Sequence, residues 1–86
     1  MSYNVELSGG AEKQLTALPK EDQVRLRDAL LDLAINPRAG DVKKLKGEHT
    51  GKYRRRVGSY RIVYEIQDKI LLVFVIWIGQ RGGAYK

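Results

Sequence analysis

Two strand-like runs, residues 52–57 and 60–65, flank Gly58-Ser59. Both flanking runs are rich in β-branched, aromatic and long side chains, and a Gly-Ser pair between such runs is typical of a two-residue hairpin turn. Such a turn fixes the register, so Arg56 is predicted to lie directly across from Arg61. The pattern therefore predicts an antiparallel hairpin.

The two faces of this predicted hairpin differ in character, because successive side chains in a strand point to opposite sides. One face is basic and carries Lys52, Arg54, Arg56, Arg61, Val63 and Glu65. The other face is predicted to be the core side and carries Tyr53, Arg55, Val57, Tyr60, Ile62 and Tyr64.

The N-terminal part predicts one strand and two helices. Alternation predicts a strand over Ser2–Leu7, and Ser8 is an expected N-cap for a helix that ends near Leu18. Pro19 suits the first turn of a second helix, which runs to about Ile35. Its expected apolar stripe is Val24, Leu26, Leu30, Leu31, Leu33, Ala34 and Ile35, and its expected water-facing residues are Glu21, Asp22, Arg25, Asp28 and Asp32.

The remaining segments complete one domain over residues 1–86. Residues 38–51 are expected to be a loop, and residues 67–69 a turn. The apolar run Ile70–Ile78 is expected to be a central strand, followed by a polar tail from Gly79. The order βααβββ predicts an α+β fold, with a mainly antiparallel sheet, a two-helix hairpin packed on one face and the other face partly open.

Charge is distributed unevenly along the chain, whose formal net charge is +6. Residues 1–36 hold four basic and six acidic side chains, a net −2, while residues 37–86 hold twelve and four, a net +8. A basic half with an overall pI near 9.8 is the electrostatic footprint of a nucleic-acid-binding protein. An acidic protein or an anionic membrane surface would attract the same charge, so charge alone leaves the partner open.

The basic face of the hairpin is the strongest chemical signal. Like charges placed opposite each other destabilise a sheet by about 0.2–1 kcal/mol per pair. Arg56, Arg61 and nearby Arg54 therefore point to a polyanion ligand rather than to stability, although many such runs are simply solvated. Guanidinium groups bind phosphate in a bidentate manner, which suits this interpretation.

Other chemistries find little support in the sequence. There is no cysteine, and His49 is the only histidine, in a glycine-flanked loop where a solvated role is expected. We therefore predict no metal site and no cofactor. The longest apolar run, residues 70–78, falls short of the roughly 20 residues that span a bilayer, and no leader is recognised, so a cytoplasmic location without membrane association is expected.

The chain resembles the RelE/ParE superfamily of type II toxin–antitoxin toxins. The resemblance covers nearly the whole chain and is carried by the spaced Ala11, Leu15 and Leu18, by Asn36-Pro37, by Lys44-Leu45-Lys46-Gly47, by the run from Tyr53 to Glu65 and by Arg81 and Tyr85. It implies a RelE-like fold and, for the RelE branch, a ribosome-dependent mRNA endonuclease that is silenced by a cognate antitoxin. The ParE branch implies a non-enzymatic inhibitor of DNA gyrase. A structural RNA-binding module is a third possibility.

The resemblance also implies a set of site residues. The family's basic positions on the first hairpin strand fall on Arg54 and Arg56, and the arginine that opens the next strand falls on Arg61. Its C-terminal arginine and tyrosine fall on Arg81 and Tyr85. Gln80 stands where family members often carry a histidine or lysine, so the general base stays open.

The implied reaction is attack of a ribose 2′-OH on the adjacent phosphate. Arginine stays protonated, so Arg54 and Arg56 are expected to stabilise charge while Arg61 clamps the phosphate. Arg81 is expected near the leaving group, and Tyr85 is expected to orient or stack a nucleotide. Lys52 is the hypothesised base, with Glu48, His49 or the ribosome as alternatives. The predicted contacts to RNA or ribosome are Lys43, Lys44, Lys46 and Arg55.

Overall fold

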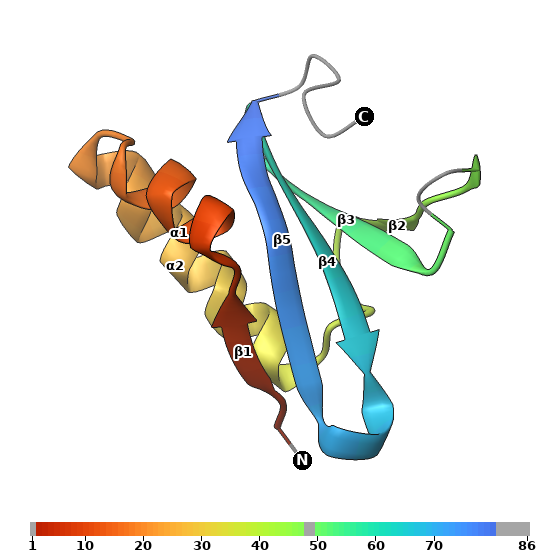
Figure 1. Ribbon diagram of the computed structural model, residues 1–86. Coiled ribbons are helices and arrows are strands. Elements are labelled where there is room, and N and C mark those ends of the chain that lie inside the picture. Colours follow the sequence, from red (N-terminus) through yellow and green to blue (C-terminus); the bar gives the residue numbers. More distant parts are fainter. Residues whose placement is uncertain (1, 48–49, 81–86) are drawn as a thin grey trace.

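A computed structural model describes residues 2–47 and 50–80 of the chain. In sequence order its elements are β1 (Asn4–Leu7), α1 (Gly9–Thr16), α2 (Lys20–Ile35), β2 (Val42–Lys44), β3 (Lys52–Val57), β4 (Tyr60–Gln67), the 3₁₀ turn η2 (Asp68–Ile70) and β5 (Leu72–Gln80). The two helices lie on one side of a single sheet (Figure 1). The α+β class and the helical hairpin on one sheet face are confirmed.

The five strands form one sheet in the order β1-β5-β4-β3-β2. Only the pairing of β1 with β5 is parallel, so the sheet is mainly antiparallel as expected. The hairpin of β3 and β4 has the predicted register, with Arg56 opposite Arg61 and Arg54 opposite Val63. Gly58 has a φ of +60°, a backbone conformation that glycine adopts without steric cost.

The hydrophobic core lies between the helices and the sheet (Figure 1). The fully buried side chains at its centre come from α2, β4 and β5. They are Leu26, Leu33, Ile62, Tyr64, Val73, Val75 and Ile78. The residues of β4 that were predicted to face the core are all buried. They are Tyr60, Ile62 and Tyr64.

Local contacts explain where the helices begin. Ser8 caps α1, since its Oγ accepts a hydrogen bond from the Ala11 backbone N–H at 3.1 Å and donates one to the Ile76 carbonyl at 3.3 Å. Pro19 is the N-cap of α2, so the helix begins at Lys20, one residue later than expected. Helix α1 ends at Thr16, so the expected helix to Leu18 is too long.

Two expectations for the second half of the chain are wrong. The expected loop over residues 38–51 contains the short strand β2, which pairs with β3 and extends the sheet by one strand. The last strand begins at Leu72 rather than at Ile70 and continues to Gln80. Ile70 belongs to η2, where it is 61% exposed, because the chain turns there before it enters the sheet.

The apolar stripe predicted on α2 is too broad. Val24, Leu31 and Ile35 are 57%, 65% and 70% exposed, whereas Leu26, Leu30 and Leu33 face the core. A helix that packs on one sheet buries only a narrow face. Val24, Leu31 and Ile35 are spaced by seven and four residues, so they form a second, exposed apolar line on α2, which we call the outer stripe.

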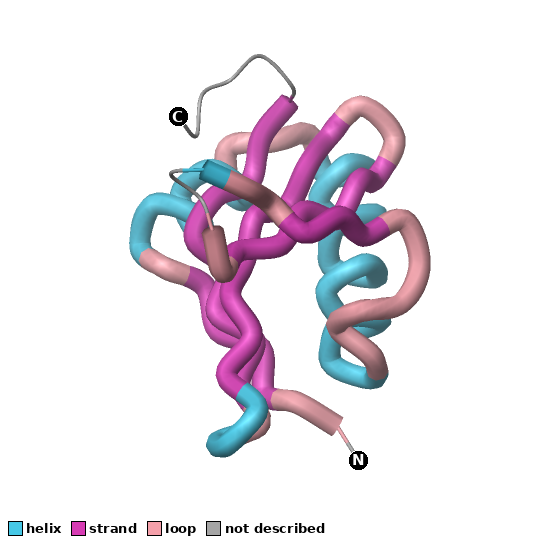
Figure 2. The backbone as a smooth tube through the Cα atoms, turned by 90° about the vertical axis from the view of Figure 1, so that its right-hand side faces the viewer, coloured by secondary structure: helices cyan, strands magenta, loops and turns pink. Residues whose placement is uncertain are grey.

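A polar clasp ties the β4–β5 turn to the rest of the fold, and Figures 1 and 2 both show the N-terminal end of β1 beside this turn. Arg38 donates two hydrogen bonds to the Asp68 carboxylate, at 3.1 and 2.9 Å, and the Tyr3 hydroxyl donates a third at 2.6 Å. The arginine and then the phenol lower the pKa of Asp68 to about 2.

Candidate nucleic-acid interface

The sheet face away from the helices carries a grid of basic side chains, because residues paired across strands share a face. One row of the grid is Lys43, Arg54, Val63 and Trp77, running across β2, β3, β4 and β5. The next row is Arg56, Arg61 and Gly79, and the row on the other side is Lys52, Glu65 and Phe74. We call these residues the outer grid.

Arg54 and Arg61 occupy the centre of the outer grid as diagonal neighbours, a relation that places Cα atoms about 7–8 Å apart. Both side chains are partly buried, and the Nε atom of each is buried without a hydrogen-bond partner. Among residues 2–47 and 50–80, no carboxylate lies within ion-pairing distance of either guanidinium. The sheet therefore holds two positive charges that have no acidic partner among these described residues.

Arg56 and Lys52 differ from these two arginines, because each has a carboxylate partner. Arg56 Nε donates to Asp41 at 3.1 Å, and the Lys52 ammonium lies 3.8 Å from the Glu65 carboxylate. The basic face defined from the sequence includes Glu65, whereas Asp41 lies in the segment that was expected to be a loop. Asp41 directly precedes β2, so the missed strand explains the missed ion pair.

Val63 is fully buried although it belongs to the outer grid and not to the core cluster. Its neighbours in the register are Arg54 on one side and Trp77 on the other, while Arg61 lies two residues away along β4. We infer from this register that the neighbouring long side chains cover Val63, a common use of arginine methylenes. The centre of the outer face is thus a packed surface rather than a loose set of solvated charges.

Arg55 is correctly placed on the core side, but its predicted contact with RNA or ribosome does not fit its position. Its guanidinium lies 3.4 Å from the Asp32 carboxylate of α2, and only 17% of its side chain is exposed. Since it points toward the helices, it is separated from the outer grid by the sheet. It secures α2 to β3.

The other predicted contact residues lie toward the edge of the sheet. Lys43 and Lys44 are exposed on β2, and Lys43 belongs to the outer grid opposite Arg54. Lys46 follows β2 in an exposed segment. The structure therefore places Lys43 beside the central arginines and Lys44 on the opposite face of the strand.

Four predicted functional positions lie outside the described residues: Glu48, His49, Arg81 and Tyr85. Their roles stay predictions. Strand β5 continues to Gln80, and its last residue in the outer grid is Gly79.

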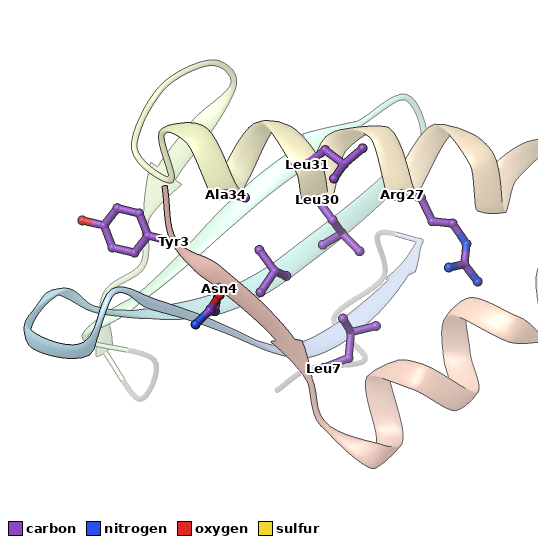
Figure 3. A pocket seen from close by; sticks show the side chains of 8 residues that line it. Tyr3, Asn4, Leu7, Arg27, Leu30, Leu31 and Ala34 are labelled. Carbon is purple, nitrogen blue, oxygen red and sulfur yellow. The ribbon is translucent and has the colours of Figure 1, made fainter. Parts of the chain in front are cut away.

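A groove between β1 and α2 is a second candidate site. Its volume is about 500 Å³, and it is lined by Tyr3, Asn4, Val5, Leu7, Arg27, Leu30, Leu31 and Ala34. Leu7 on β1 and Leu30 on α2 point toward one another across it (Figure 3). Its lining is largely apolar and includes Leu31 of the outer stripe.

No cluster of three or more His, Cys, Asp or Glu side chains able to hold a metal ion occurs within residues 2–47 and 50–80. Over the described ranges, none of the helices is long and apolar enough to cross a lipid bilayer.

A helical hairpin on one face of the sheet and a basic grid on the other define a small α+β protein with one strongly basic surface. A family model described as the ParE toxin of type II toxin–antitoxin systems matches residues 5–85. The chain belongs to this family, within the RelE/ParE superfamily of toxins.

Individual relatives lie on the RelE side of the superfamily. A protein named RelE1 from Methanocaldococcus jannaschii is 32% identical over 89 residues, covering 100% of this chain and 98% of its own length. The mRNA interferase toxin RelE of Escherichia coli is 30% identical over 82 residues, covering 94% of this chain and 85% of its own. These relatives favour a type II toxin of the mRNA-interferase kind over the gyrase alternative.

A solved structure shows the same fold in a complex. The chain matches one in the RelBE2 toxin–antitoxin complex from Mycobacterium tuberculosis with a TM-score of 0.86 and 27% identity, covering 94% of this chain and 100% of that one. The expected RelE-like fold is therefore confirmed.

Proposed function

We propose that this chain is an endoribonuclease that cleaves mRNA on the ribosome and thereby inhibits translation. The observation that carries the proposal is the pair of central arginines, Arg54 and Arg61. Their Nε atoms are buried without partners, and a sheet holds both side chains in place. Two fixed cations about 7–8 Å apart at their Cα atoms suit a phosphodiester better than they suit stability.

The proposed reaction needs three functions from the enzyme. The 2′-oxygen forms a bond to phosphorus as the bond from phosphorus to the 5′-oxygen breaks, which leaves a 2′,3′-cyclic phosphate and a 5′-OH end. A base takes the proton from the 2′-OH, and an acid gives one to the 5′-oxygen. Arg54 and Arg61 stabilise the negative charge that develops on the phosphorane.

Lys52 is the proposed base. It lies on the outer grid in the row next to Arg54, so it shares the face that would hold the phosphate. Glu65 lies 3.8 Å from its ammonium. Only the neutral amine has a lone pair, so the lysine must lose a proton before its nitrogen can accept one from the 2′-OH. Arg81 would donate a hydrogen bond near the leaving oxygen, and Tyr85 would orient or stack a nucleotide. Alignment of the 2′-OH by the ribosome would supply several kcal/mol of the barrier.

Brief induction of the wild-type protein, followed by mapping of 5′-OH ends on cellular RNA, tests this function. Cuts inside translated codons support it, and an antibiotic that blocks initiation should abolish them by removing ribosomes from the message. Growth arrest accompanied by DNA breaks and no new RNA ends would instead identify a gyrase inhibitor. RNA ends that persist without ribosomes would contradict the ribosome requirement.

We also propose a cognate antitoxin that covers apolar surface as well as charge. The related toxin of M. tuberculosis was solved in a toxin–antitoxin complex. In this chain, the outer stripe and the groove between β1 and α2 together leave apolar side chains exposed. An acidic chain with an apolar face would complement both this surface and the net charge of +8 on residues 37–86.

Co-expression with the product of an adjacent gene tests this partner. Salt screens interactions between exposed charges, so an electrostatic complex weakens at high ionic strength, whereas an apolar interface does not. We expect a complex that survives several hundred millimolar salt and that weakens when Leu31→Asp is introduced in the outer stripe. Complete dissociation by salt alone would exclude the apolar contact.

A further inference from the structure

Trp77 is the only tryptophan of the chain, and the sequence patterns assigned it no role beyond filling an apolar strand. The structure places it on the outer face, in the same row of the outer grid as Arg54 and Val63. The neighbouring strand residues Ile78 and Val75 face the core instead. The reason is a register shift between Val63 and Tyr64, which lets β5 present Trp77 on the basic side.

The indole ring lies over Gly79. A Cβ atom built on Gly79 would be only 2.6 Å from Cζ2 of Trp77 and 2.8 Å from Cη2, so the benzene part of the ring fills the place of the missing side chain. Gly79 is paired with Arg61 across the strands. The ring is therefore directed along β5 to the position opposite the Arg61 side chain.

This arrangement puts an aromatic surface beside the two arginines that the proposed function assigns to the phosphate. Single-stranded nucleic acids are bound by such combinations, in which cations hold the backbone and an aromatic ring stacks on a base. The spacing fits one nucleotide: adjacent strands lie about 4.8 Å apart, so a base on β5 and a phosphate at β3–β4 are one or two strands apart.

We propose that Trp77 is a base-stacking platform that positions the nucleotide next to the scissile phosphate, with Gly79 allowing the ring to lie toward Arg61. Trp77 acts as a positioning residue for RNA, not as an acid or a base. The proposal rests on the proposed RNA-cleaving function, and it adds that the site distinguishes a chain with bases from a bare polyanion.

Binding of a short 2′-O-methyl oligoribonucleotide tests the proposal, because this probe lacks the attacking hydroxyl and stays intact. Since the chain has a single tryptophan, its fluorescence reports on this site alone. We expect saturable quenching by the oligonucleotide. An abasic oligomer of the same length and inorganic polyphosphate should bind without comparable quenching.

Variants separate stacking from structural support. By anisotropy of a labelled oligonucleotide, Trp77→Ala should weaken binding about 5- to 150-fold, the range that base stacking accounts for. Trp77→Phe should recover part of the loss. Gly79→Ala, which displaces the ring but keeps it, should weaken binding and reduce quenching. Binding of the abasic oligomer should change little in all three.

The opposite results would overturn the proposal. Equal quenching by abasic and normal oligomers would show that only charge is sensed. A lower melting temperature for Trp77→Ala with unchanged oligonucleotide affinity would show that the ring only covers Val63. If wild type cuts translated mRNA while Trp77→Ala binds and cuts equally well, the platform fails and the nuclease stands. Trp77-dependent binding without any 5′-OH ends would contradict the nuclease instead.

Discussion

Replacing Arg61 with alanine is the sharpest test of the outer grid, because loss of this side chain is expected to reduce activity strongly and to change stability little. Loss of one preorganised donor to a developing oxyanion costs about 10²–10³ in rate, or roughly 2.7–4 kcal/mol. We expect a loss of that size in cleavage of ribosome-bound mRNA, measured from the appearance of 5′-OH ends.

The expected change in folding free energy is small, because two terms offset. Removing a like charge opposite Arg56 stabilises the sheet by about 0.2–1 kcal/mol. Losing the stem that helps to cover Val63 exposes apolar area, at about 25 cal/mol per Å². A net change below about 1 kcal/mol corresponds to a shift of at most about 4–8 °C in Tm for a domain of this size.

Arg56→Ala is the matched control, since it removes the same charge from the facing position. Arg56 is paired with Asp41, and both side chains are about half exposed, at 52% and 56%. An exposed pair of this kind contributes only about 0.2–1 kcal/mol. We expect a smaller loss of cleavage than for Arg61→Ala. Equal losses in both variants, full cleavage by Arg61→Ala, or its unfolding would refute the assignment of the phosphate to Arg61.

Three further predictions concern the base and the fold. Lys52→Ala should slow cleavage by bound protein, whereas Lys43→Ala should mainly weaken ribosome binding and its salt dependence; small, equal effects would make Lys52 another phosphate contact. Tyr64→Phe should lower the urea-derived free energy of unfolding by about 1–3 kcal/mol, because the buried hydroxyl donates to the Pro37 carbonyl at 2.6 Å; an unchanged midpoint would show that water replaces it. The pKa of Asp68 is about 2 in the folded protein and near 4 in the unfolded chain. Its ionised form should therefore stabilise the fold above about pH 4, and this contribution should be lost as the pH falls from about 4 to 2. If Asp68→Asn loses stability equally steeply over that range, this carboxylate is not the cause.

Local sequence determined the hairpin and its chemistry. A two-residue turn at Gly58 sets which residues of β3 and β4 face each other, and the side-chain period of two then assigns each residue to a face. For this reason Arg54, Arg56 and Arg61 could be placed on one surface before any coordinates were known. The helices could also be predicted from the sequence, because capping and the 3.6-residue period are local signals too.

Tertiary structure decided which of these arginines has an acidic partner. Asp41 neutralises Arg56 only because β2 joins the sheet, and a strand of three residues carries too short a pattern to be recognised. Asp32 reaches Arg55 from a helix 23 positions away in the chain. Neither pairing has a local signature.

The same limit applies to exposure and to Trp77. Periodicity marks apolar positions on α2 but does not show how wide a face the sheet covers, so the exposure of Leu31 and Ile35 depends on packing between layers. The register shift beside Val63 reverses the face on which the following part of β5 presents its side chains. This irregularity places Trp77 on the basic face. One extra residue in a strand changes the face to which the following side chains point, and only the pairing with β4 shows where that residue lies.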